Sequence, residues 1–210
     1  MFNELIRLGQ WSAENPLAKI RQFKISEREL SFLTLAQIQL LLKTLELGRS
    51  IDAWLVTQVC LATGARWSEA EQLRPSQVRD GAVHFSGTKS GKNRSVPIGE
   101  ELLALLDEHL GKRYGDAKTT ATRYFVHSYT AFRDAINECG IELPKGQLTH
   151  VLRHSFASHF IMVGGNILVL QRILGHSSLT MTMRYAHLAP EHLQEAKALN
   201  PLIQLKASTS

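Results

Sequence analysis

One stretch near the C-terminal end constrains the possible folds and partners of this chain more than any other. No Asp or Glu occurs between Leu143 and Pro190. Because such a segment cannot neutralise its own positive charge, we expect it to lie against negative charge supplied from outside. Tyr185 belongs to the same stretch, so a tyrosine hydroxyl accompanies these charges. The cations and imidazoles that the stretch collects are Lys145, Arg153, Arg172, Arg184, His150, His154, His159, His176 and His187.

A second window, residues 81–99, also lacks acidic side chains. Over the whole chain 24 Lys and Arg oppose 19 Asp and Glu, which leaves a net charge of +5. A basic balance favours a polyanionic partner. Because the excess is concentrated in two windows rather than in one tail, the pattern favours a nucleic acid more than net charge alone does.

Hydrophobic periodicity predicts a mainly α-helical fold with a small three-stranded antiparallel sheet. Alternation predicts strands at Val78, 82–85 and 94–97, with Asp80-Gly81 as a tight hairpin turn. Residues 111–122 are polar and are expected to form a loop. Helical spacing, with Thr34, Ser50 and Thr149 as caps, predicts helices over residues 34–48, 50–64, 67–73, 100–110, 129–139, 150–162, 167–174, 179–187 and 190–199.

The two cysteines, Cys60 and Cys139, lie in apolar helical patterns and are expected to be buried free thiols in a reducing cytoplasm. The first residues lack the features of a signal peptide. No apolar run approaches the ~18 residues that a membrane span needs. These observations predict no membrane partner.

Cleavage of a DNA phosphodiester needs fixed cations beside the non-bridging oxygens, a nucleophile and an acid for the leaving oxygen. Arginine suits the first task because it stays charged and can bond two oxygens at once. A two-metal mechanism needs clustered carboxylates, which both basic windows lack. His150 and His154 have the spacing of a zinc pair, but Val151 stands where a zinc protease has Glu. The sequence therefore favours phosphoryl transfer without a metal or other cofactor.

Four segments together resemble the tyrosine recombinase family, and most closely the integrases of temperate phages. They read TGARWSEAEQL, TKSGKNRSVPI, HVLRHSFASHF and LGHSSLTMTMRYAHL, and they occur in family order. The resemblance covers about residues 30 to 200. It implies the catalytic-domain fold of that family.

The resemblance also implies a role for particular side chains. Arg94 and Lys92 are alternatives to Lys89 as the acid for the leaving oxygen, and Glu69 would orient the basic cluster. His154 and His159 do not match catalytic positions and are interpreted as packing or DNA-facing residues. The implied catalytic residues are Arg66 and Arg153 on the scissile phosphate, Lys89 as acid for the 5′ oxygen, His150 in proton transfer, His176 as a donor to a phosphate oxygen, and Tyr185 as nucleophile.

By this resemblance the chain is a site-specific recombinase that cleaves and rejoins DNA through a 3′-phosphotyrosine, for integration or excision of phage DNA in a bacterial cytoplasm. The implied partners are double-stranded DNA and further copies of the chain, as a dimer or tetramer on DNA, with room for DNA-bending accessory proteins. The alternatives are a decayed DNA-binding module and a type IB topoisomerase-like relaxing activity.

Family members usually carry an N-terminal DNA-binding domain. Residues 1–33 are therefore expected to be the linker or entry segment from a missing domain of this kind, with a helix packed on the body of the chain as the alternative. Residues 34–189 are expected to form the catalytic domain. Residues 190–210 are expected to form a C-terminal helix and tail that pack on the chain's own body or on a neighbouring protomer.

Overall fold

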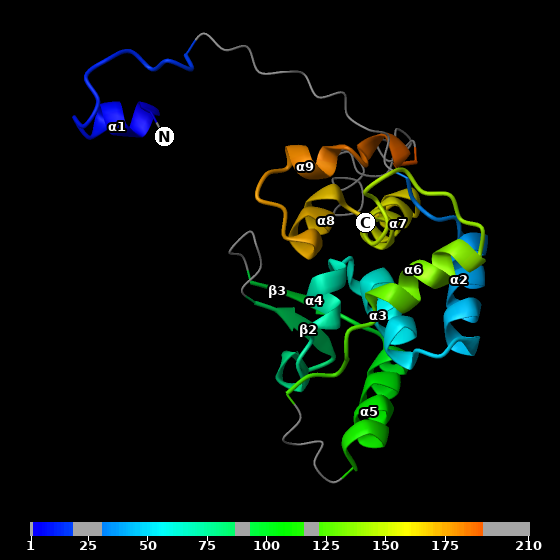
Figure 1. Ribbon diagram of the computed structural model, residues 1–210. Coiled ribbons are helices and arrows are strands. Elements are labelled where there is room, and N and C mark those ends of the chain that lie inside the picture. Colours follow the sequence, from blue (N-terminus) through cyan, green and yellow to red (C-terminus); the bar gives the residue numbers. More distant parts are fainter. Residues whose placement is uncertain (1, 19–30, 87–92, 116–121, 191–210) are drawn as a thin grey trace, which may run out of the picture.

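The computed structural model describes residues 2–18, 31–86, 93–115 and 122–190 (Figure 1). Outside these ranges lie Lys89, Lys92, residues 191–199 of the last predicted helix and the C-terminal tail. Within the described ranges, no helix combines the length and the apolarity that a membrane span needs.

The described chain is mainly helical and carries one small sheet, which confirms the predicted fold class. The helices are α1 (Phe2–Arg7), α2 (Leu35–Leu47), α3 (Ile51–Thr63), α4 (Trp67–Glu71), α5 (Glu100–Tyr114), α6 (Tyr129–Glu138), α7 (His150–Met162), α8 (Ile167–Leu174) and α9 (Thr180–Met183), with 3₁₀ turns η1 (Pro75–Gln77) and η3 (Ala186–Leu188). The strands are β1 (Val78–Arg79), β2 (Ala82–Phe85) and β3 (Arg94–Pro97), joined antiparallel in the order β1-β2-β3.

Local sequence signals explain most of these boundaries. Thr34 and Gln37 form the predicted capping box at the start of α2. Asp80 and Gly81 both have positive φ, as the tight turn between β1 and β2 requires. Thr149 was predicted to cap α7, but its side chain makes no capping bond. Its backbone is already helical at φ −79° and ψ −20°, whereas a capping residue is extended.

Helix α5 is longer than the sequence predicts, because it continues through Gly111 to Tyr114 instead of ending at residue 110. A tertiary contact favours the extra turn. Arg113 places Nη2 2.7 Å from Oδ2 of Asp52, a buried carboxylate at the start of α3. His109, one turn earlier on α5, places Nε2 3.0 Å from Oδ1 of the same group.

The single helix predicted over residues 179–187 is also wrong. Helix α9 ends at Met183, and η3 begins at Ala186, with Tyr185 between them. The amide of Tyr185 donates to the carbonyl of Thr182, and the amide of Leu188 donates to the carbonyl of Tyr185, both at 3.0 Å. These bonds span three residues and wind the backbone more tightly than an α-helix does.

Helix α3 forms the centre of the core and packs against α2, α5, α6 and α7 (Figure 1). A smaller apolar cluster of Ala157, Ile161, Leu170, Leu174 and Tyr185 lies where α7 meets α8 and η3. Helix α7 therefore contributes to both clusters and connects the centre of the fold to the segment that carries Tyr185.

Helices α3 and α8 both end at a glycine with left-handed backbone, Gly64 at φ 64° and Gly175 at φ 65°. A Cβ added to Gly64 would lie 2.6 Å from Cδ1 of Phe156 and 2.8 Å from Cδ2 of Leu174. The end of α3 is thus packed directly against α7 and the end of α8.

We expect Gly64→Ala to lower the free energy of unfolding by about 3 kcal/mol. The left-handed backbone costs a non-glycine residue about 1–2 kcal/mol, and overpacking adds about 1–3 kcal/mol. Gly140 is the matched control, because it has φ 63° and open space around its Cα. Gly140→Ala should cost only the backbone share, about 1 kcal/mol. Equal losses for both variants in urea unfolding would refute the close packing at Gly64.

Candidate active site

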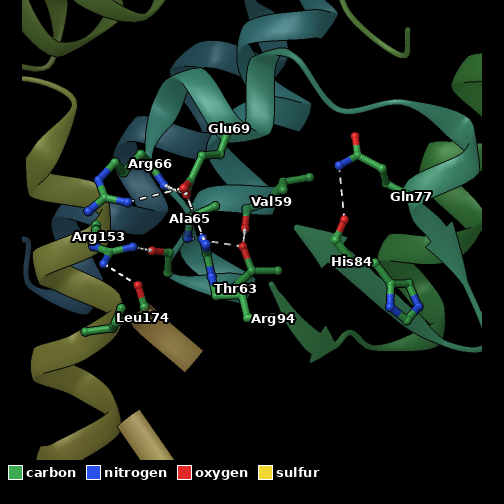
Figure 2. A network of polar contacts seen from close by, with 11 residues as sticks. Val59, Thr63, Ala65, Arg66, Glu69, Gln77, His84, Arg94, Arg153 and Leu174 are labelled. Carbon is green, nitrogen blue, oxygen red and sulfur yellow. Dashed lines mark hydrogen bonds and ion pairs between the residues drawn. The ribbon is translucent and has the colours of Figure 1, made fainter. Parts of the chain in front are cut away.

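The guanidinium of Arg153 lies between the C-terminal ends of two helices. Nη1 donates to the carbonyl of Gly64 at 2.8 Å, and Nη2 donates to the carbonyl of Leu174 at 2.6 Å (Figure 2). Only 4% of Arg153 is exposed. Helix C-termini carry partial negative charge and unpaired carbonyls, so they stabilise a buried cation. The charge of Arg153 is thereby held in place without being cancelled by a carboxylate.

Two further arginines share the carboxylate of Glu69 (Figure 2). Arg66 places Nη1 3.2 Å from Oε1 of Glu69, and Arg94 places Nη2 2.6 Å from Oε2. Arg94 is buried and stacks on the ring of Phe85, with Cζ 4.3 Å from the ring centroid. Burial would raise the pKa of Glu69, but the contacts with Arg94 and Arg66 outweigh it and lower that pKa. Glu69 is therefore ionised and fixes both guanidinium groups.

Positive charge exceeds negative charge at this site. The guanidinium groups of Arg66, Arg94 and Arg153 are accompanied by the one carboxylate of Glu69. Burial, followed by repulsion from Arg66 and Arg94, lowers the pKa of Arg153 to about 10. Arg153 remains protonated at neutral pH, so the cluster is poised to bind an anion.

His176 lies beside the arginines, directly after the glycine that ends α8. Its Nδ1 is 2.9 Å from Oγ1 of Thr182 on α9, and 8% of the residue is exposed. Burial, together with the charges of Arg153 and Arg66, lowers the pKa of His176 to about 4. At neutral pH the imidazole is uncharged.

The hydroxyl of Tyr185 is occupied by a histidine that sequence reasoning did not place in the site. Nδ1 of His154 lies 2.7 Å from the Tyr185 hydroxyl, and Tyr185 is 2% exposed. Burial, followed by the charges of His150 and Arg184, lowers the pKa of His154 to about 4. The sequence holds no local signal for this contact, because the two residues are 31 positions apart and meet where η3 packs on α7.

The phenol itself is not activated in this state. Burial raises the pKa of Tyr185, although Arg153 and Arg184 act in the opposite direction. The two arginines favour the phenolate, but desolvation of the ring outweighs them, so the tyrosine is a protonated hydrogen-bonding group.

An open cleft of about 750 Å³ leads to the cluster. Its lining includes Arg66, Glu69 and His150, together with Arg74 and Arg123. Among the described lining residues, Glu69 is the only carboxylate. The cleft is large enough for an extended polyanion and is lined mainly by cations and polar groups.

The predicted site residues are thus largely brought together. Arg66 and Arg153 belong to one charged cluster, and His176 lies beside it. Tyr185 lies close enough for Arg153 to influence its pKa. His150 lies on the same helix, one turn before His154, and lines the cleft. Lys89 and its alternative Lys92 lie outside the described residues. The other alternative, Arg94, is buried against Glu69. In the described ranges, no three His, Cys, Asp or Glu side chains converge as metal ligands would.

Comparison with known proteins identifies relatives of the whole chain. It is 52% identical over 209 residues to the integrase of Escherichia phage 186, covering 99% of this chain and 59% of that protein. It is also 52% identical to the integrase of Haemophilus phage HP1, covering 96% of this chain and 57% of that protein. The chain therefore spans somewhat under three fifths of the length of these two relatives.

A solved structure and a family model agree with these relatives. The catalytic domain of bacteriophage HP1 integrase superimposes with a TM-score of 0.75 at 52% identity, over 83% of this chain and 97% of that domain. Residues 31–192 match the family model described as the phage integrase family. This chain belongs to the phage integrase family.

Proposed function

We propose that this chain cleaves and rejoins DNA strands as a site-specific tyrosine recombinase and serves the integration or excision of phage DNA. One observation carries the proposal: the charges of three arginines, balanced by a single carboxylate, are fixed near a buried tyrosine, and Arg66 of this cluster lines an open cleft. The kinship with phage integrases supports the same activity. The chain spans only part of the length of those relatives, so recombination by the full-length protein is also a proposal.

The proposed reaction gives each of the implied site residues a role. The Tyr185 oxygen attacks the phosphorus and forms a 3′-phosphotyrosine, while the bond from phosphorus to the 5′ oxygen breaks and that oxygen takes up a proton. Arg66 and Arg153 stabilise the charge that develops on the non-bridging oxygens. His176 donates to one of these oxygens. We propose Lys89 as the acid that protonates the 5′ oxygen, and His150 as a participant in removing the proton that the Tyr185 hydroxyl loses as it attacks.

Rejoining needs no external energy source, because the phosphotyrosine bond conserves the energy of the phosphodiester. The 5′ hydroxyl of a second strand attacks the phosphotyrosine and releases Tyr185. Exchange between two duplexes requires further copies of the chain on the DNA. A topoisomerase-like relaxing activity would use the same chemistry without partner copies. A decayed binding module is disfavoured because every described member of the implied set is present.

We propose that the DNA backbone follows the cleft beyond the reactive phosphate, toward Arg74 and Arg123. The amide of Tyr124 donates to the carbonyl of Leu73 at 3.0 Å, so the backbone next to Arg123 is tied to the backbone next to Arg74, and both arginines line the cleft. The hydroxyl of Tyr114 donates to the carbonyl of Arg123 at 3.0 Å. This anchoring supports a fixed pair of cations for neighbouring phosphates.

We also propose roles for the two ends of the chain. Residues 1–33 would link to an N-terminal DNA-binding domain, and residues 190–210 would dock on the chain's own body or on a neighbouring protomer. DNA-bending accessory proteins would act on the assembled complex.

Tyr185→Phe should bind DNA normally but form no covalent adduct with a nicked suicide substrate, because it lacks the attacking oxygen. The measurement is a denaturing gel followed by identification of the peptide that carries the DNA. Tyr129→Phe, a change at a more exposed tyrosine on α6, is the matched control and should form adduct at the wild-type rate. Adduct formation by Tyr185→Phe would refute the assignment of the nucleophile.

Replacing both Arg74 and Arg123 by Ala should weaken DNA binding about tenfold and reduce the slope of log affinity against log salt by about 2, since each lost phosphate contact removes about 1. Titrations between about 50 and 200 mM salt would measure both quantities. Arg133→Ala removes an exposed arginine that pairs with Asp134 on α6, and it should leave the slope unchanged. The same slope in the double variant as in the wild type would exclude these arginines from the DNA path.

A further inference from the structure

We infer that His154 is a positioning residue for the nucleophile: Nδ1 of its imidazole accepts the hydrogen bond of the Tyr185 hydroxyl and thereby fixes the direction in which that oxygen can attack. The inference rests on the proposed function, because it concerns how the same tyrosine reacts. The resemblance to the family assigned His154 no catalytic role.

The contact is short and enclosed. Nδ1 of His154 is 2.7 Å from the Tyr185 oxygen, and the two ring centroids are 6.1 Å apart at an interplanar angle of 44°. The residues are 31 positions apart, so the contact depends on the docking of η3 against α7. Tyr185 packs with Ala157, Ile161 and Leu174, which restrain its ring while His154 restrains its oxygen.

The surroundings of His154 fix its protonation state. Besides burial, four neighbouring groups lower the pKa of His154 and so disfavour a positive charge on its ring: His150, Arg184, Arg153 and His176. A neutral imidazole has one acceptor nitrogen. With Nδ1 assigned as the acceptor of the Tyr185 hydroxyl, the hydrogen of the imidazole resides on Nε2.

This arrangement orients the reactive oxygen. A nucleophile attacks through a lone pair, so its hydrogen has to point away from phosphorus. With the hydrogen directed at Nδ1 of His154, the lone pairs of the Tyr185 oxygen face other directions and remain available to a phosphate. The arrangement also leaves a restrained torsion in place of a freely rotating hydroxyl, and misplacement of a reacting group by about 1 Å can cost about 10²-fold in rate.

If His154 had only a packing role, its substitutions would affect cleavage in a different order. If His154 only filled space, an apolar side chain of similar volume would replace it. If the acceptor matters, a residue with an acceptor at the position of Nδ1 should replace it. Asn meets this condition because its amide oxygen is bonded to Cγ, as Nδ1 is in histidine, and it cannot titrate near neutral pH.

The experiment compares His154→Asn and His154→Leu in single-turnover cleavage of a suicide substrate, with DNA affinity measured in parallel. We expect Leu to slow cleavage by about 10²-fold and Asn to remain within about fivefold of wild type, both at unchanged affinity. The control is His159→Asn. His159 lies on the same helix but bonds the carbonyl of Leu33 at 2.8 Å, so cleavage should not change.

A substrate whose 5′ bridging oxygen is replaced by sulfur separates the two sides of the reaction, because a thiolate leaves without an acid. The defect of His154→Leu should persist on it, since the defect lies on the nucleophile side. Recovery of the rate on this substrate would overturn the inference by moving His154 to the leaving-group side.

The remaining outcomes are also decisive. Equal losses of cleavage rate in His154→Asn and His154→Leu, or no loss in His154→Leu, would overturn the inference. Cleavage by the wild type would still support the proposed function in either case. Absence of any adduct with the wild type would overturn the proposed function and the inference with it. If the Leu variant does not fold, the ¹⁵N chemical shift of His154 Nδ1 serves instead. It should move toward that of a free acceptor nitrogen in Tyr185→Phe, and an unchanged shift would contradict the contact.

Discussion

The site depends on the burial of one guanidinium between two helix C-termini. Arg153 donates to the carbonyls of Gly64 and Leu174 at the ends of α3 and α8, and each of these helices ends at a glycine in the left-handed conformation. A carboxylate in the same place would have held the arginine equally well but would have cancelled its charge. Backbone carbonyls hold it and leave the charge available to a ligand.

The protonation states of the neighbouring groups follow from this positive charge. The imidazoles of His154 and His176 stay neutral because burial and the arginines oppose a further cation. Tyr185 stays protonated because burial outweighs the attraction of Arg153 and Arg184. The site therefore rests with cations in place and a phenol hydrogen-bonded to a neutral base, and a bound phosphodiester would supply the missing negative charge.

Local patterns in the sequence predicted most elements, because caps, turns and periodicity act within a few residues. The box at Thr34 and the Asp80-Gly81 turn are examples. The predicted helix boundaries were wrong where contacts between distant residues determine the backbone. The ion pair of Arg113 with Asp52 favours the extra turn of α5. The segment around Tyr185 forms two separate short helices in place of the single predicted one. The charged cluster was predictable from motifs and the exclusion of carboxylates. The contact of His154 with Tyr185 was not, because it arises when η3 docks on α7.

The central claim is that the site carries fixed positive charge that an anion neutralises. The most direct measurement is an NMR titration of the His154 and His176 imidazoles, with and without a DNA duplex bound to a variant that cannot cleave. The account predicts pKa values of about 4 for both without DNA, well below the ordinary 6.5, and higher values with DNA because the phosphate offsets the arginines. Ordinary pKa values in the free protein, or values that DNA leaves unchanged, would contradict it.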